Sequence, residues 1–225
     1  MVTESQLERR IGYEFSERSS LKRALTHKSA GRDNNERLEF LGDAVLGYIV
    51  GSLLFRLHPD WQEDKLSLAR AQLVRGSTLA EIASEIRLGD HIVLGSGEKR
   101  SGGKERHSIL ADTLEALIGA VHQDGGIASA TSVVEGLFLD RVSRIVPDSL
   151  KDSKTLLQEL LQAKHRPIPE YEIESTSGAD HAKRYTVVCR LVDGGELGRA
   201  TASSRRAAEK AAAAELLDAL AQSND

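Results

Sequence analysis

The stretch ERLEFLGDAVL, residues Glu36–Leu46, carries three carboxylates on a segment that otherwise has the composition of a protein core. In an α-helix, which turns by about 100 degrees per residue, Glu36, Glu39 and Asp43 project from one stripe and apolar residues cover the rest. A capping box between Asp33 and Glu36 explains the first acid, because carboxylates are favourable in the first turn of a helix. It does not explain Asp43, whose carboxylate would lose hydration two turns into an apolar helix.

A second apolar segment, SILADTLEALIGAV at 108–121, carries two further acids three residues apart, and therefore on one helix face. If the two helices pack together, their carboxylates meet, and mutual repulsion raises their pKa values unless a cation lies between them. Oxygen ligands without histidine or cysteine suit Mg²⁺, with Mn²⁺ able to substitute. Solvated acids on an amphipathic face would explain either helix alone, but explain the joint occurrence less well. We therefore expect a metal site formed by Glu39, Asp43, Asp112 and Glu115.

The composition describes an ordinary globular protein of 225 residues, 40% of them hydrophobic, with a formal net charge of −4. RNA binding would therefore depend on local clusters of Lys and Arg rather than on overall charge. The longest apolar run, Ala44–Phe55, is too short to cross a bilayer, and the first residues lack a signal-peptide pattern, so we expect no membrane partner and a cytoplasmic protein. The single cysteine, Cys189, is expected to be a reduced, buried strand residue.

The first part of the chain has apolar residues at spacings of three and four up to about Ile145, which predicts an all-helical domain over residues 1–146. The glycine-dense segment Gly95–His107 predicts a mobile loop whose basic side chains are able to reach phosphates. The helices are expected at Gln6–Ile11, Ser19–Leu25, Glu36–Leu57, Asp64–Gly76, Ser77–Ile86, Ile109–Asp124 and Ile127–Val142.

After a predicted linker at 147–152, the pattern changes from helical spacing to alternation. A helix in KTLLQELLQAK precedes strands at 170–175, 184–191 and 196–202, and an Ala-rich helix follows at 205–221. This α-β-β-β-α order predicts a second, small α+β domain over residues 153–222, with three antiparallel strands and both helices on one face.

The residues around the acids resemble the bacterial ribonuclease III family. The match to its signature is closest in NERLEFLGDAVL, residues 35–46, and continues through ALTHKS at 24–29, RAQLVRGSTLAEIA at 70–83 and SGGKERHSILADTLEALIGAV at 101–121. The resemblance implies a multi-domain protein with an all-α catalytic domain followed by a double-stranded RNA binding domain. It also implies a homodimeric endonuclease of double-stranded RNA that uses no small-molecule cofactor.

The resemblance also assigns roles to individual residues of the first domain. The family's outer catalytic acids correspond to Glu36 and Glu63. Its central, metal-binding acids correspond to Glu39, Asp43, Asp112 and Glu115. Phe40 corresponds to the aromatic residue that plugs a socket on the partner subunit, with plain core packing as the alternative. His27 is expected to be structural. His107 departs from the charged residue, commonly Glu, found in relatives, which we expect to affect loop behaviour or RNA contacts.

The chemistry implied is metal-dependent hydrolysis of phosphodiesters in structured transcripts such as precursor rRNA and mRNA. Two ions about 4 Å apart are able to activate water and to stabilise the leaving 3′ oxygen. The products would carry 5′-phosphate and 3′-hydroxyl ends with short 3′ overhangs, one cut per strand from a two-fold symmetric dimer.

RNA-contacting residues of the second domain also follow from the resemblance. A cluster at the start of the last helix, where Ser203 and Ser204 can cap, is suited to phosphates. Relatives usually have glycines where this chain has Ala200 and Ala202, and a basic residue at Ala207, so we expect RNA affinity below that of typical relatives. The expected RNA contacts are Thr155, Gln158, Glu159, His181, Arg205, Arg206 and Lys210.

Two other functions are compatible with parts of the sequence. A noncatalytic RNA-binding or ribosome-associated protein could keep the same fold, but it would have no reason to retain six carboxylates at these positions. A metal phosphohydrolase of small molecules would leave the second domain without a purpose. The acid set therefore favours the nuclease.

Overall fold

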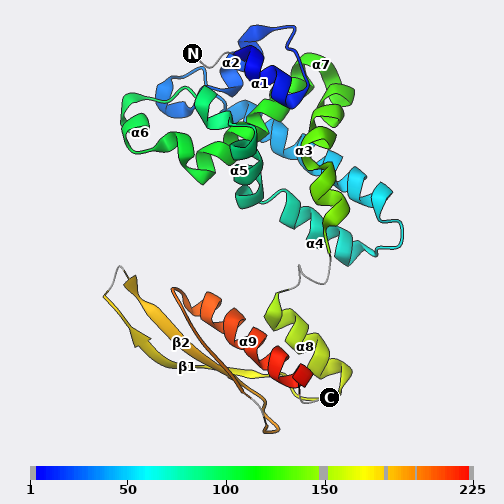
Figure 1. Cartoon of the computed structure of the whole chain (residues 1–225), viewed down its shortest axis with the longest axis vertical. Coiled ribbons are helices and arrows are strands. Elements are labelled where there is room, and N and C mark those ends of the chain that lie inside the picture. Colours follow the sequence, from blue (N-terminus) through cyan, green and yellow to red (C-terminus); the bar gives the residue numbers. More distant parts are fainter. Residues whose placement is uncertain (1–3, 147–151, 180–181, 196, 223–225) are drawn as a thin grey trace. The chain divides into compact units, whose positions relative to one another are not determined.

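The computed structural model describes residues 4–146, 152–179, 182–195 and 197–222, and divides the chain into two compact units, Met1–Pro147 and Asp148–Asp225 (Figure 1). The described part of the first unit is helical, and the second has the order α-β-β-β-α. The predicted fold class is thus confirmed. Of the predicted linker at 147–152, all but Asp152 lies outside the described residues.

Helices of very different length build the first unit. The two segments predicted at Ile109–Asp124 and Ile127–Val142 are two helical stretches within α7, and they are separated as predicted at Gly126, whose φ of 75° and ψ of −176° are not helical. Short 3₁₀ turns are found at η1 (Lys28–Ala30), η2 (Leu88–His91) and η3 (Gly103–Glu105). The α-helices are α1 (Glu4–Ile11), α2 (Arg18–Ala24), α3 (Glu36–Leu57), α4 (Glu63–Leu73), α5 (Gly76–Glu85), α6 (Ser96–Arg100) and α7 (His107–Arg144).

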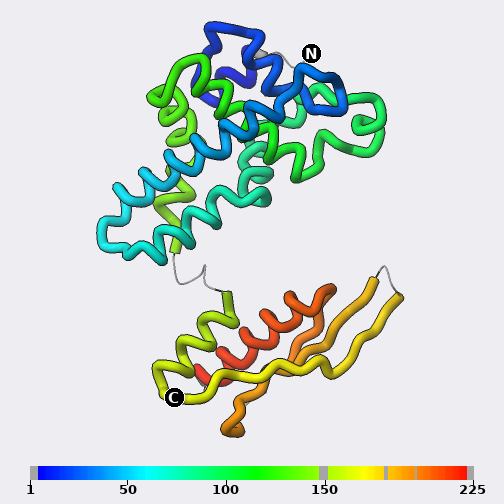
Figure 2. The backbone as a smooth tube through the Cα atoms, turned by 180° about the vertical axis from the view of Figure 1, so that it is seen from behind, coloured from blue at the N-terminus to red at the C-terminus, as the bar shows by residue number. Residues whose placement is uncertain are grey.

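The helices α3 and α7 lie side by side and form the centre of this unit (Figure 2). Two glycines permit the close approach. A Cβ atom on Gly42 would overlap the carbonyl oxygen of Glu115, and one on Gly119 would overlap that of Leu38. Around the crossing, Leu46, Ile49 and Leu117 are buried. The two acid-bearing segments are therefore held together by backbone contact as well as by apolar burial.

The helix α3 is long and apolar enough by composition to resemble a membrane span. Its buried side chains instead pack inside the first unit, where they include Leu38, Val45, Leu46, Ile49, Val50, Leu53 and Leu54. Because α7 packs against this apolar surface, α3 is a core helix of the first unit.

The segment Gly95–His107 differs from the predicted mobile loop. Much of it forms α6 and η3, and an ion pair of 2.6 Å joins Arg106 to Glu98. The buried Gly103 lies so close to Glu98 that a Cβ atom would have to displace it. Glycine here allows close packing of a structured turn, a role that composition alone does not distinguish from flexibility.

The start of α3 also differs from the predicted capping box. Asn35 is the N-cap and its side chain makes no capping hydrogen bond, while the N–H of Glu36 donates to Oδ1 of Asn34 at 3.0 Å. Asp33 pairs instead with Arg23, at 2.7 Å. The predicted capping box was wrong because α3 begins at Glu36 with Asn35 as its N-cap, which leaves Asp33 two residues before the cap position.

The second unit is a three-stranded antiparallel sheet, in the order β1-β2-β3, with both helices packed on one face (Figure 1). Its core includes Leu157 and Leu161 of the first helix, Val187 and Cys189 of the central strand, and Leu216 of the last helix. Cys189 is thus buried, as predicted. The elements are α8 (Ser153–Ala163), β1 (Glu170–Ser177), β2 (Arg184–Arg190), β3 (Leu197–Ala202) and α9 (Arg205–Gln222).

Candidate active site

Three of the predicted acids converge where α3 crosses α7. Glu39 projects from α3, and Asp112 and Glu115 project from successive turns of α7. One carboxylate oxygen from each lies within 4.8 Å of the others, and all three side chains are half-buried. The spacing seen in sequence and the glycine-mediated helix contact therefore act together to bring these acids to one point.

The three converging carboxylates all have raised pKa values. Burial, followed by the charges of Asp43, Asp112 and Glu39, raises the pKa of Glu115 to about 7. Burial is also the largest cause of the raised pKa of Glu39, with Asp112 next. Burial is thus the first cause of both shifts, and at Glu39 and Glu115 the neighbouring carboxylates add the repulsion that the sequence predicted.

The donor set suits a hard divalent cation. Carboxylate oxygens are the ligands that Mg²⁺ and Mn²⁺ prefer, and a cation among them would offset the repulsion that raises these pKa values. Asp43, one turn after Glu39, lies outside the group of three, although its charge acts on Glu115. The residues present therefore fit a metal site centred on three acids, with the fourth beside it.

The two outer acids differ in their surroundings. Glu36 is exposed at the start of α3, where Oε1 lies 3.4 Å from Nζ of Lys28. Glu63 begins α4 and accepts a hydrogen bond of 2.7 Å from Ser67, in a concavity that also contains Tyr48 and Phe55. Glu63 is not brought into the group of three, and its role as an outer acid stays a prediction.

Lys28 and His27 are neighbours of the cluster that the sequence reasoning did not assign to the site. Burial raises the pKa of Asp112, and the charges of Lys28 and then His27 oppose that rise. His27 is the N-cap of η1, where Nδ1 accepts from the N–H of Ser29 at 3.2 Å. The available signal was the motif ALTHKS, in which His27 is expected to be structural and Lys28 is given no role.

Phe40 is 82% exposed, so plain core packing does not explain it within the described part of the chain. Tyr48 and Phe55 are also largely exposed on the same helix, α3. Large exposed apolar side chains on one element are typical of an interaction surface. The prediction that Phe40 contacts a partner subunit is consistent with this exposure.

The predicted RNA contacts of α8 share an exposed surface. Thr155, Gln158 and Glu159 are all exposed, and their spacing of three and four residues places them on adjacent turns. His181 lies outside the described residues. The α8 contacts are therefore accessible to a ligand, and their role stays a prediction.

The basic residues at the start of α9 are divided between internal ion pairs and solvent. Arg205 pairs with Glu209 at 2.8 Å, and Lys210 pairs at 2.7 Å with Asp152, the N-cap of α8. Lys154 also binds Glu209, and its hydrogen bond is the largest cause of the lowered pKa of that acid.

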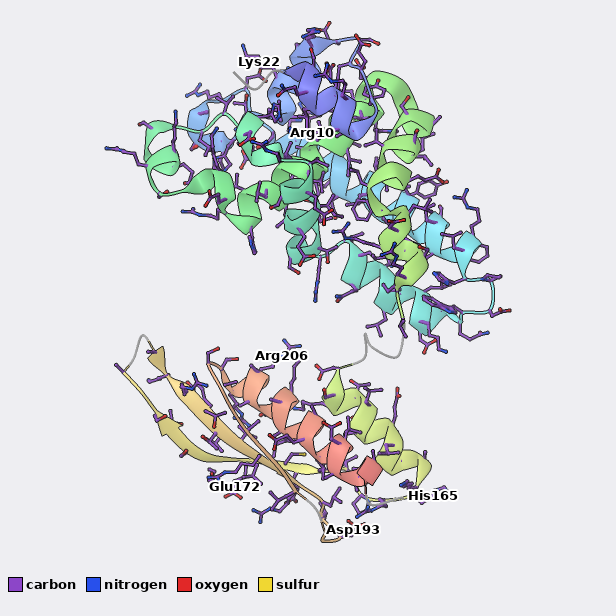
Figure 3. The ribbon with its side chains drawn as sticks, viewed as in Figure 1. Arg10, Lys22, His165, Glu172, Asp193 and Arg206 are labelled. Atoms are coloured by element: carbon purple, nitrogen blue, oxygen red, sulfur yellow. The ribbon has the colours of Figure 1, made fainter. Side chains whose placement is uncertain are left out.

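Arg206 lies at the N-terminal end of α9 (Figure 3), and among the described residues it forms no ion pair. The hydroxyl of Ser204 caps the helix by accepting from the N–H of Ala207 at 3.2 Å. Free backbone N–H groups and an uncommitted guanidinium at a helix N-terminus suit a phosphate. Arg206 is therefore the cation of this cluster best placed to meet an external anion.

The alanines that replace two glycines are not strained. Ala200 and Ala202 lie in β3, and among the described non-glycine residues only Arg87 and His165 have positive φ. Alanine therefore carries no cost from a positive φ at these two positions. Any effect on RNA affinity would have to arise from the added methyl groups.

Comparison with known proteins agrees with both units. Residues 17–142 match the family described as Ribonuclease-III-like, and residues 153–220 match the double-stranded RNA binding motif. A Ribonuclease 3 of Haemophilus influenzae is 47% identical over 219 residues, which cover 96% of each chain. A Ribonuclease 3 of Shewanella amazonensis is 47% identical over 215 residues, covering 95% of each.

Solved structures give the same result for the first unit. The nuclease domain of ribonuclease III from Campylobacter jejuni matches with a TM-score of 0.61 and 44% identity, covering 65% of this chain and 100% of that one. A second structure of that nuclease domain, described as flexible in a region involved in dimer formation, matches with a TM-score of 0.58 and 44% identity, covering 61% and 99%.

A helical unit with clustered carboxylates, followed by a double-stranded RNA binding motif, defines an endoribonuclease that acts on double-stranded RNA. The extent and identity of the matches make the assignment specific. The chain belongs to the ribonuclease III family.

Proposed function

We propose that this endoribonuclease uses Mg²⁺, held by Glu39, Asp43, Asp112 and Glu115, and that Mn²⁺ substitutes for it. The observation that carries the proposal is the convergence of three carboxylates within 4.8 Å at the crossing of α3 and α7. Their raised pKa values support it, because a site so unfavourable to its own charges gains most from a cation.

Each part of the site has a distinct task in this proposal. A bound divalent cation supplies Lewis-acid polarisation of the phosphate and lowers the pKa of water. Glu39 and Glu115 hold the cation from two helices, so the rigid helix crossing sets the geometry. Glu36 and Glu63 act as outer acids. The cut leaves a 5′-phosphate and a 3′-hydroxyl.

The assembly we propose is a homodimer in which Phe40 enters the partner subunit. Its exposure of 82% supports this role, since burial of such a side chain stabilises association. Two symmetric sites would then make one cut in each strand and leave short 3′ overhangs. Structured precursors of rRNA and mRNA in the cytoplasm are the proposed substrates.

In the second unit, we propose that α8 contacts the RNA minor groove through Thr155, Gln158 and Glu159. The loop containing His181 would enter the next minor groove, and Arg205, Arg206 and Lys210 would bind phosphates. The exposure of the α8 residues supports this arrangement, as does the guanidinium of Arg206, which forms no ion pair with another described residue.

The test is cleavage of a perfectly paired RNA of about 30 base pairs, long enough for a binding domain that spans about 16. The unmodified protein is compared with Glu115→Gln in Mg²⁺ and in chelator, and binding is followed by gel shift. We expect metal-dependent cuts from the unmodified protein. Glu115→Gln should lose more than about 100-fold in rate while still binding RNA, since it removes a metal-ligand charge.

The matched control is Glu135→Gln, which makes the same change on α7 but removes only an ion pair with Arg56. We expect it to cut at the rate of the unmodified protein, because exposed ion pairs contribute little. Full activity of Glu115→Gln would contradict the proposed ligand role. Binding without any cleavage by the unmodified protein would favour the noncatalytic alternative.

A further inference from the structure

Lys28 is a basic residue at the edge of an acidic site. Its Nζ lies 3.4 Å from Oε1 of Glu36, and its charge opposes the raised pKa values of both Glu39 and Asp112. The ammonium group is therefore within electrostatic reach of acids from both α3 and α7. Lys28 is the residue of η1 whose charge is opposite to that of the cluster.

The backbone that carries Lys28 is held firmly. The N–H of His27 donates to the carbonyl of Val93 at 3.1 Å, and the N–H of Gly95 donates to the Ser29 hydroxyl at 2.9 Å. A Cβ atom on Gly95 would overlap the carbonyl oxygen of Ser29, so the two segments are in close contact. The Lys28 side chain therefore starts from a defined point beside the acids.

The contact between Lys28 and Glu36 is one that the protein can give up at little cost. The Lys28 side chain is 63% exposed and that of Glu36 is 54% exposed, so water already solvates both groups. Exposed ion pairs of this kind contribute about 0 to 1 kcal/mol. The side chain is thus available for a stronger anion, such as a phosphate.

An RNA strand that enters this site brings phosphates toward Glu36, Glu39, Asp43, Asp112 and Glu115. Repulsion between these charges has to be offset, and a metal ion among the central acids offsets only part of it. A lysine acts as a compact point charge that binds phosphate oxygens on a flexible stem. Lys28, beside Glu36 at the edge of the acid cluster, supplies such a charge where the RNA strand would approach.

We propose that Lys28 leaves Glu36 when RNA binds and contacts a nonbridging oxygen of a phosphate in the strand that is cut, thereby positioning that strand against the acids. The inference rests on the proposed metal-dependent function of the same site. Loss of the Lys28 charge and loss of an acid should change metal affinity in opposite directions. The reason is that a nearby cation disfavours metal binding and favours phosphate binding.

The experiment compares the unmodified protein with Lys28→Gln, Lys28→Ala and Lys28→Arg in cleavage of the same RNA duplex in Mg²⁺. Mn²⁺ binding without RNA is measured by isothermal titration, and folding by thermal melting. The control is Lys22→Gln, the same change on the exposed surface of α2 (Figure 3).

We expect Lys28→Gln and Lys28→Ala to lower kcat/KM by about tenfold or more, the effect of losing one hydrogen bond between charged groups. Lys28→Arg should keep at least about half of the unmodified activity, because it retains the charge. Mn²⁺ should bind the two neutral variants at least as tightly as the unmodified protein. Lys22→Gln should be unchanged in all three measurements.

Two results would overturn the inference. Neutral variants that fold and cleave within about twofold of the unmodified protein would show that Lys28 makes no productive phosphate contact. Parallel loss of Mn²⁺ binding and cleavage would show that Lys28 supports the geometry of the acids instead. An unmodified protein that does not cleave in Mg²⁺ would contradict the proposed function itself, which is a separate failure.

Discussion

Glu115 links the chemistry of the cluster to the stability of the first unit. Its pKa is raised from 4.5 to about 7 by burial and by the charges of Asp43, Asp112 and Glu39. Between these two pH values, the folded protein binds a proton that the unfolded chain has released. Without metal, the free energy of unfolding therefore falls as pH rises through this window.

The prediction is that Glu115→Gln, in chelator, melts at a higher temperature than the unmodified protein at about pH 8, and at a similar temperature at about pH 5. The amide removes a buried charge that is present only at the higher pH. Thermal melting at the two pH values measures the difference.

Glu135→Gln serves as the control, because Glu135 lies on the same helix and pairs with Arg56 at the surface. Adding Mg²⁺ should stabilise the unmodified protein more than Glu115→Gln, since a ligand that binds only the folded state raises stability. Equal melting temperatures at about pH 8 in chelator would contradict a raised pKa at Glu115.

The contact between α3 and α7 explains how two segments about 70 residues apart in sequence form one site. Gly42 and Gly119 lie at the closest approach, where side chains larger than hydrogen would overlap opposing backbone. Since backbone on both sides is held in helices, neither side is able to move away easily. The small residues of the signature are thus part of the site geometry.

We predict that Gly42→Ala destabilises the protein by about 3 kcal/mol or more, because the new methyl group overlaps the Glu115 carbonyl and forces the helices apart. Metal affinity should fall with it, since Glu39 and Glu115 separate. Denaturant unfolding and Mn²⁺ titration measure the two effects.

The matched control is Gly136→Ala on α7, where nothing lies within 4 Å of the added carbon. Alanine at an exposed helical position is expected to stabilise by up to about 1 kcal/mol. Gly42→Ala with the stability of Gly136→Ala would mean that the helices do not approach as closely as described.

The two units divide the task, with acids in the first and an RNA binding motif in the second. With a net charge of −4, the chain depends on localised cations for affinity. At the start of α9, Glu209 and Asp152 already neutralise Arg205 and Lys210 in part, whereas Arg206 remains available.

We predict that combining Arg205→Ala with Arg206→Ala weakens binding to duplex RNA by tenfold or more, as estimated for the loss of two phosphate contacts. The slope of log affinity against log salt should fall by about 2. Gel-shift titrations at several salt concentrations measure both.

Arg190→Ala is the control for this pair. Arg190 follows the buried Cys189 in β2, so its side chain points to the face of the sheet opposite the helices. We expect its binding to equal that of the unmodified protein. A double variant with unchanged affinity and slope would show that the start of α9 does not bind phosphate.

The sequence by itself determined the helical and α+β units, because periodicity records which residues are buried. It named the three acids that converge, Glu39, Asp112 and Glu115, together with a fourth, Asp43, that lies outside their group. It also predicted that repulsion between carboxylates contributes to the raised pKa values of Glu39 and Glu115, where burial is the larger cause.

Only the tertiary structure decided which partner each of several charged side chains has. Asp33 pairs with Arg23 rather than capping α3, Glu98 and Arg106 stabilise a glycine-rich segment that composition predicted to be mobile, and Lys28 lies beside the acids. The physical reason is the same in each case. A local pattern specifies backbone conformation and burial, whereas the partner of a charged side chain depends on how the turns between helices place the two side chains in space.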